Sequence, residues 1–240
     1  SIVSFGGRLG GAIAPLLTAW LLKEFFGWRT VLMVYGAIGL LVALYFWRIF
    51  RESPSEHVKC NAAERELIIA LDEDTDERTR PAFPPLLSLI GSVTMWQMCF
   101  LQFGINVGWV FLVTWLPTYL QDVKGVDPTI GGLMSTIVLV SGIVGMLLGG
   151  PLTDACARKL GKRWGRSLPM AACYAIALAA YLSCLNLDSA WSFIAAASVV
   201  AFVTDMSVPA IWAYMQDVGG KNTAAVFGWG NMWGNFGAAT

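Results

Sequence analysis

The sequence predicts an all-α membrane protein built as a polytopic helical bundle, and its composition and charge pattern carry this prediction. Of its 240 residues, 56% are hydrophobic and 13% are charged, whereas soluble domains carry about a quarter charged residues. The mean hydropathy is +0.61. The charges gather in a few short segments that separate long uncharged runs. This pattern excludes a water-solvated globule.

Seven apolar runs are long enough to cross a bilayer, which takes roughly 20 helical residues. Because the chain opens on Ser1 inside a small-residue run and the last run meets no polar boundary, we expect a fragment. The first run lacks the basic flank and cleavage site of a signal peptide, so it is read as a span. The runs cover approximately 3–26, 28–50, 93–120, 129–152, 168–187, 190–216 and 223–240.

Basic residues fall mostly on one side of these spans, which sets the orientation. Three lie on the other side: Lys23, Arg29 and Lys124. The bias places the loops after the second, fourth and sixth spans in the cytoplasm. Tryptophans near the span ends agree with this topology: Trp28, Trp47, Trp96, Trp115, Trp164 and Trp191. The twelve basic residues of the predicted cytoplasmic side are Arg48, Arg51, Lys59, Arg65, Arg78, Arg80, Arg158, Lys159, Lys162, Arg163, Arg166 and Lys221.

Local patterns predict helix packing and one helix start. Asn61 followed by Glu64 is typical of a capped helix N-terminus inside the polar segment 51–88, which is otherwise read as a solvated linker. Glycines repeat at four-residue spacing, which favours close approach of helices in lipid. These pairs are Gly7 and Gly11, Gly104 and Gly108, Gly145 and Gly149, and Gly230 and Gly234.

Enzymatic chemistry is not supported. A single histidine, His57, excludes multi-histidine metal sites, and no glycine-rich phosphate loop with its lysine is present. We therefore expect no enzyme activity, no metal site and no cofactor. The five cysteines lie mostly in or beside apolar runs and are read as buried small side chains rather than a disulfide framework.

The segment after the fourth span carries the most specific motif. Gly150 lets helix ends meet, and Asp154 can cap the next helix or pair with the basic cluster Arg158, Lys159 and Arg163, which would latch one face shut. The alternative is an ordinary basic cytoplasmic loop with an incidental aspartate.

This spacing resembles the loop motif of the major facilitator superfamily, in the copy between its eighth and ninth helices. Four further segments resemble the anion:cation symporter branch, which includes hexuronate, galactonate, sialic acid and vesicular glutamate carriers. They are Gly-Gly-Ala-Ile-Ala-Pro at 10–15, Gly-Trp-Arg at 27–29, Thr-Trp-Leu-Pro-Thr-Tyr-Leu at 114–120 and Asn-Met-Trp-Gly-Asn at 231–235.

The resemblance covers nearly the whole chain and implies a partial major facilitator fold, helices five to eleven of twelve. By this register, 1–50 holds the last two helices of the amino-terminal half and 51–88 is the cytoplasmic loop between halves. Residues 89–240 form the carboxyl-terminal half with its last helix or helices truncated.

Ionisable residues at membrane depth are costly and are read as functional candidates. Arg8 lies in the first span, where carriers of this branch often have Gln, and an arginine there can hold a substrate carboxylate with two hydrogen bonds. Alternatively, Arg8 extends to the cytoplasmic interface. Asp205 in the sixth span is read either as the carrier of a coupling proton or as a permanent partner of Arg8 or another cation.

Aromatic and amide side chains complete the predicted site. Pro209, Trp212 and Gln216 follow Asp205 on one helical stripe, which we expect to face a cavity. The resemblance implies that Trp212 holds substrate against its ring, and packing is the alternative. Asn106 and Asn231 are read as substrate contacts or, equally, as interhelical hydrogen-bonding groups.

One departure from the resemblance bears on the substrate. Val208, Pro209 and Ile211 stand where sugar-acid carriers place hydroxyl residues, which argues against a polyhydroxylated substrate.

Together these observations predict a secondary active transporter of a small organic anion such as a sugar acid or other carboxylate. Coupling to H⁺ or Na⁺ and alternating access of two halves are expected, in a multi-pass protein of the cell inner (plasma) membrane. Expected partners are the anion, the lipid bilayer and the missing helices of the parent chain. Nucleic acid is not expected, and the full-length protein should be a monomer. The 240 residues alone should not transport.

Two rival readings come from other classes. A seven-helix receptor or retinal-type sensor would suit seven runs, but no span offers a well-placed lysine for a Schiff base. A non-transporting truncated product or scaffold or sensor relative is the second alternative.

Overall fold

The computed structural model describes residues 6–7, 9–11, 13, 17–18, 21, 27–51, 60–66 and 86–240, apart from the side chains of Leu86, Ser88, Lys162 and Lys221. The chain divides into two compact units, one formed by 13–82 and the other by 1–12 together with 83–240. Each is described by itself. The first predicted span, 3–26, falls largely outside the described residues.

The smaller unit contains one long helix, α2 (Trp28–Ile49), which follows Gly27 in extended conformation. This helix is apolar and almost wholly exposed, with Val31 as its buried residue. A short helix over 62–66 begins as predicted, because the Glu64 N–H donates to Asn61 Oδ1 at 2.8 Å.

The larger unit begins with α4 (Leu86–Ile90) and α5 (Val93–Val110). The next helix, η2 (Phe111–Trp115), has π geometry, and α6 (Leu116–Asp122) continues it. Pro117 explains this register, because proline has no N–H to donate to the carbonyl four residues before it. The Leu116 N–H donates instead to the Phe111 carbonyl, five residues back.

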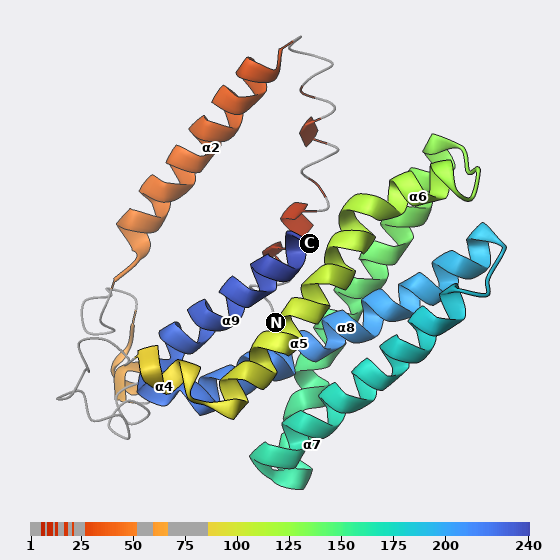
Figure 1. Ribbon diagram of the computed structural model, residues 1–240. Helices are drawn as coiled ribbons and strands as arrows, with labels where there is room; N and C mark the ends of the chain where they lie inside the picture. The colour runs from red at the N-terminus through yellow and green to blue at the C-terminus, as the bar shows by residue number, and fades with distance from the viewer. Residues whose placement is uncertain are drawn as a thin grey trace. The chain divides into compact units, whose positions relative to one another are not determined.

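Helix α7 (Pro128–Cys184) consists of two antiparallel halves, Pro128–Gly161 and Arg163–Cys184 (Figure 1). They meet at Gly161, whose φ of +76° is a left-handed conformation that favours glycine. The first half therefore runs well past residue 152, where the sequence ends the fourth span. The predicted gating segment from Gly150 to Lys159 is helical here, not a loop.

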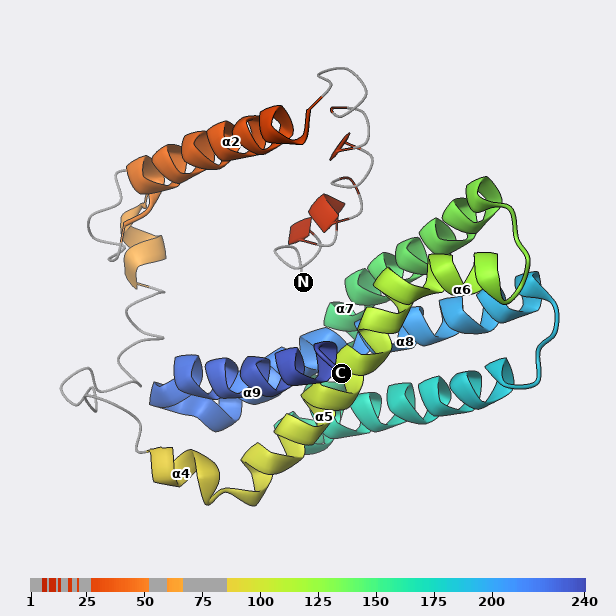
Figure 2. The ribbon, with the colours of Figure 1, turned by 45° about the horizontal axis from the view of Figure 1, so that its top comes forward.

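Helix α8 (Ala190–Gly219) lies at the centre of the bundle and contributes to three buried clusters. It packs along α7 over much of its length and also contacts α9 (Thr223–Ala238), which follows the short 3₁₀ helix η3 (Gly220–Asn222). Helix α5 packs against α9, and Figure 2 shows these two crossing beside α8. The principal cluster joins Leu116, Leu120, Met134, Val138, Phe193 and Val200 from α6, α7 and α8.

The glycine pairs predicted to mediate close packing do so at two places. A Cβ on Gly145 or Gly149 would collide with the backbone carbonyls of Phe202 or Met206, so α7 and α8 touch backbone to backbone. A Cβ on Gly234 would lie 2.7 Å from Asn106 Nδ2 in α5. Small residues therefore set the distances between α7 and α8 and between α5 and α9.

Five described helices are long and apolar enough to cross a membrane. They are Trp28–Ile49, Val93–Asp122, Pro128–Gly161, Arg163–Cys184 and Ala190–Gly219, which correspond to the second to sixth predicted spans. The helix at the seventh predicted span, α9, is not among these five. All five cysteines are free; Cys60, Cys99 and Cys173 are buried as predicted, whereas Cys156 and Cys184 are half-buried. The chain is a multi-pass helical membrane protein.

Candidate functional site

Trp212 and Asn231 lie on the accessible side of neighbouring helices. Trp212 in α8 is 41% exposed, and its ring meets that of Phe227 in α9 edge to face, with 6.3 Å between centroids. Asn231 is one helical turn beyond Phe227 and is exposed. Its carbonyl accepts a hydrogen bond from Asn235 Nδ2 at 2.8 Å. The structure thus brings an indole ring and an amide onto one open surface, here called the α8–α9 face.

Asn106 is half-buried at the contact between α5 and α9. Its Nδ2 donates to the Gln102 carbonyl oxygen at 2.9 Å, and the same amide packs against Gly234. Gln102 is also buried at this contact, where its Cγ lies near Gly230. The Asn106 amide therefore donates to a carbonyl of its own helix. It contacts α9 at Gly234, about one helical turn from Asn231.

Asp205 is buried, unlike the other residues of the predicted stripe, Pro209, Trp212 and Gln216. It is 3% exposed, and its Oδ2 lies where a side chain on Gly142 would have to go, 2.7 Å from an ideal Cβ. Exposure rises along the stripe through Pro209 to Trp212 and Gln216. The structure therefore separates Asp205, closed between α7 and α8, from Trp212 on the open face. Arg8 lies outside the described residues, so its predicted pairing with Asp205 stays a prediction.

A pair of hydroxyl groups that sequence reasoning missed joins α7 to α8 near Asp205. Tyr174 OH, in the second half of α7, is 2.6 Å from Ser207 Oγ in α8, and the Ser207 hydroxyl donates to the Thr204 carbonyl at 2.7 Å. The proximity of Ser207 to Asp205 in α8 was visible in the sequence. The partner, Tyr174, was not, because it comes from another span.

The basic segment after Gly150 connects to α8 through a residue the motif did not single out. Arg166 forms an ion pair with Asp217 and also donates to the Ala213 carbonyl. Asp217 lies near the carboxyl end of α8. An acidic residue there, opposite in charge to the basic segment, is the signal by which the sequence could have indicated this pair.

The predicted gating residues themselves are on the surface. Asp154, Arg158, Lys159 and Arg163 are exposed, and Gly150 is half-buried. Within the described part of the chain, Asp154 forms no ion pair. The Arg163 guanidinium lies 5.7 Å from the Trp164 ring centroid. The gating role of these residues stays a prediction.

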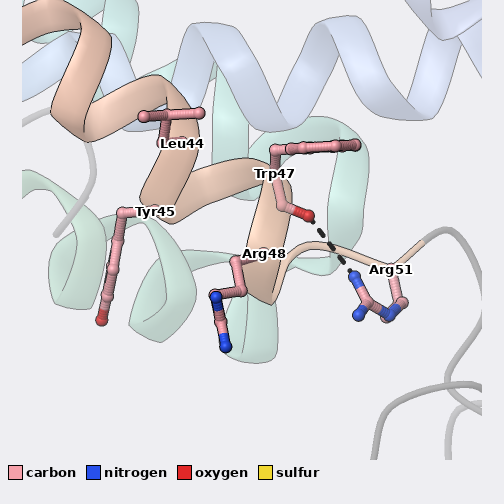
Figure 3. Close-up of a pocket in the computed structure, with 5 residues that line it drawn as sticks. All are labelled: Leu44, Tyr45, Trp47, Arg48 and Arg51. Atoms are coloured by element: carbon pink, nitrogen blue, oxygen red, sulfur yellow. Dashed lines mark hydrogen bonds between the residues drawn. The ribbon is translucent and has the colours of Figure 1, made fainter.

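The carboxyl end of α2 carries a shallow recess of its own, shown in Figure 3. Arg51 Nη1 donates to the Phe50 carbonyl at 2.7 Å and to the Trp47 carbonyl at 3.4 Å, so it caps the helix end. Arg48, Tyr45 and Trp47 are exposed beside it. All lining residues belong to one stretch of chain, as expected for a helix end at a membrane surface.

Comparison with known proteins places this chain in a family. The profile of the Major Facilitator Superfamily matches residues 1–240. The probable sulfoacetate transporter of Cupriavidus necator is 29% identical over 235 residues, which cover 97% of this chain and 53% of the relative. The probable galactarate/D-glucarate transporter of Bacillus subtilis is 28% identical over 240 residues, covering 95% and 51%.

A third relative matches a shorter stretch. The probable L-galactonate transporter of Escherichia coli is 34% identical over 148 residues, 61% of this chain and 31% of the relative. The chain spans about half the length of the first two relatives. The family profile, in contrast, extends over every residue of the chain. The chain belongs to the major facilitator superfamily.

Proposed function

We propose that the protein carrying this chain is a secondary active transporter of a small organic anion, and not an enzyme. The observation that carries the proposal is the family match over all 240 residues, together with similarity to relatives whose names specify sulfoacetate, galactarate or glucarate. These compounds share a small skeleton with one or more acidic groups. The protein would act in the cell inner (plasma) membrane.

The α8–α9 face supports a binding role. Trp212 offers an open indole surface steadied by Phe227, and the exposed Asn231 amide offers hydrogen-bond donors to a carboxylate or sulfonate oxygen. Asn106 would add a second amide from α5 once its bond to Gln102 exchanges. We propose that substrate binds against this face, with Arg8 as a further anion contact.

Coupling and gating are proposed from separate residues. Asp205 would carry the coupling proton, or balance a sodium ion, from its place between α7 and α8. The segment containing Gly150, Asp154, Arg158, Lys159 and Arg163 would gate the cytoplasmic face, and the Arg166–Asp217 pair would tie that segment to α8. The two halves of the full protein would then expose the site alternately.

Uptake by proteoliposomes tests this proposal. The full protein is reconstituted and offered radiolabelled sulfoacetate, glucarate and galactonate, each under an inward proton gradient, an inward sodium gradient or neither. We expect accumulation of at least one anion under one gradient and loss of accumulation when that gradient is collapsed. Absence of uptake for every acid tried, under both gradients, would refute anion symport.

Two tryptophans of the same helix then test the site. Trp212→Ala should reduce uptake about two- to tenfold, because an aromatic contact contributes about 0.5–1.5 kcal/mol. Trp191→Ala is the matched control, since Trp191 is 56% exposed and lies at the start of α8, whereas Trp212 lies in the second half of the same helix. Equal uptake by the two variants would remove the α8–α9 face from the substrate site without touching the transport proposal.

A further inference from the structure

A recess with one cation lies at the end of the bundle away from the Gly161 turn. The connection after α6 and the connection between α7 and α8 meet there (Figure 1). Lys124, from the first connection, donates from Nζ to the Leu187 carbonyl at 2.7 Å and the Asp188 carbonyl at 3.3 Å in the second. The half-buried ammonium therefore joins two connections that are distant in the chain.

The recess beneath Lys124 has about 430 Å³ of space, within the roughly 300–1,000 Å³ range of ligand pockets. Its walls are mostly apolar and aromatic, with Phe111, Leu112 and Phe193 among them, and Tyr119 and Tyr181 also line it. Tyr119 packs on Phe193 with 5.0 Å between ring centroids. Such a lining accepts a hydrocarbon chain and gives a polar skeleton few partners.

The wall of the recess includes irregular helix. Phe111 and Leu112 open the π segment η2, which Pro117 imposes, and single-turn π segments occur frequently at functional sites. The wider register displaces these two side chains from the positions they would take in a regular α-helix. Part of the recess wall is therefore π-helix, whose register follows from Pro117.

The charge on Lys124 has only neutral partners among the described residues. Two carbonyl dipoles and the Phe193 ring, 5.8 Å from Nζ, surround the ammonium, and no carboxylate of the described chain forms an ion pair with it. An ammonium carries three donors, and two are used. A singly charged anionic group can accept the third and neutralise the charge.

The rim indicates which anion fits. Leu185, at the lip, is 80% exposed, so the opening is apolar and suits a bilayer surface. The exposed Asp188 side chain on the same rim repels multiply charged soluble anions more strongly than a phosphodiester with one charge. Basic pockets between membrane helices on the cytoplasmic side bind anionic lipid headgroups, and Lys124 offers the same charge attraction here.

We propose that this recess binds a phospholipid from the membrane leaflet opposite the basic segment 158–166. Its phosphate accepts a hydrogen bond from Lys124, and an acyl chain lies against Phe111, Leu112 and Phe193. The lipid holds together the two connections that Lys124 joins. The inference depends on the membrane setting of the chain and not on the identity of its transported substrate.

Two half-buried cysteines allow a direct test in the full protein. Cys184 lines the recess, whereas Cys156 lies in the first half of α7 toward the Gly161 turn. Delipidated protein is treated with N-ethylmaleimide, and alkylation of each cysteine is followed by peptide mass spectrometry. We expect phosphatidylglycerol to slow the alkylation of Cys184 severalfold and to leave Cys156 unchanged.

Two further compounds test whether the acyl chains or the phosphate of the lipid protect Cys184. Diacylglycerol with the same chains supplies the hydrocarbon, and glycerol 3-phosphate supplies the headgroup alone. Neither should protect Cys184 at the concentration at which phosphatidylglycerol does. Equal protection by diacylglycerol would overturn the role of the phosphate. Equal protection by glycerol 3-phosphate would make the recess a soluble-anion site, and no protection by any probe would refute the proposal outright.

Substitutions of Lys124 test whether its charge binds the phosphate. Lys124→Gln should require about fivefold more phosphatidylglycerol for the same protection, from about 1 kcal/mol per lysine at an anionic surface, and Lys124→Arg should restore it. Arg29→Gln is the matched control, because Arg29 lies 5.1 Å from the Trp28 ring but lines no part of this recess. An equal effect of Arg29→Gln, or no effect of Lys124→Gln, would contradict the assignment. Unchanged Cys156 alkylation shows that each variant is folded.

Discussion

The contact between α7 and α8 has no room for a methyl group at Gly145, and Gly145→Ala tests whether this contact holds the bundle together. An ideal Cβ there would collide first with the Phe202 carbonyl oxygen, and it would also lie 2.8 Å from the Phe202 carbonyl carbon and 3.0 Å from its Cα, where ordinary contacts begin at 3.4 Å. Because the obstacle is backbone, the helices must separate by at least about half an ångström. Such overpacking costs about 1–3 kcal/mol, and a gap of that size forfeits about a quarter of each affected dispersion contact.

The assay is thermal unfolding of the purified protein in detergent, followed by size-exclusion chromatography after heating. A loss of about 2 kcal/mol should lower Tm by roughly 5 °C. Gly132→Ala is the control, because Gly132 lies in the same half of α7 and has nothing within 4 Å of an added Cβ. It should be neutral or slightly stabilising, since alanine favours helix by about 1 kcal/mol over glycine. If Gly145→Ala melts no lower than Gly132→Ala, the packing argument fails.

Three further changes address other parts of the bundle. Gly161→Ala forces a side chain onto a φ of +76° and should cost about 1–3 kcal/mol in the same melting assay; a neutral result would mean that the α7 turn tolerates another conformation. Arg166→Gln and Asp217→Asn should each destabilise by about 1 kcal/mol, and a double-mutant cycle should give a coupling that added salt weakens. A salt-independent coupling would contradict an ion pair. Tyr174→Phe should lower stability by about 1 kcal/mol, and equal melting of variant and parent would show that its hydroxyl bond contributes nothing.

Much of the fold follows from the sequence because the length of an apolar run is a local property. The predicted spans beginning at 28, 93 and 190 match helices that begin at Trp28, Val93 and Ala190. The fourth helix ends later than its predicted span, which stops at residue 152. A helix can continue beyond the bilayer into water when its residues favour helix. Hydropathy marks the membrane boundary, whereas the helix stops at Gly161, where the backbone turns.

The candidate site is less accessible to sequence reasoning because it depends on contacts between distant segments. Helical spacing alone predicts that Asp205 and Trp212 lie on one surface. Whether each residue is open depends on its neighbours: Gly142 in α7 admits the Asp205 carboxylate, and Phe227 in α9 leaves much of Trp212 accessible. Helical spacing fixes the direction of a side chain but not the presence of another helix in front of it.

This separation has a mechanical consequence for the proposed transport cycle. A carboxylate closed between helices at membrane depth must be neutral or compensated, because an isolated buried charge is too costly. Protons can exchange with Asp205 only if water reaches it, and the backbone contacts at Gly145 and Gly149 close that side of α8. Exchange with Asp205 across this side of α8 therefore needs α7 and α8 to part, whereas Trp212 and Asn231 are exposed without such movement. A coupling role for Asp205 thus links proton exchange to a helix displacement that substrate contact alone does not need.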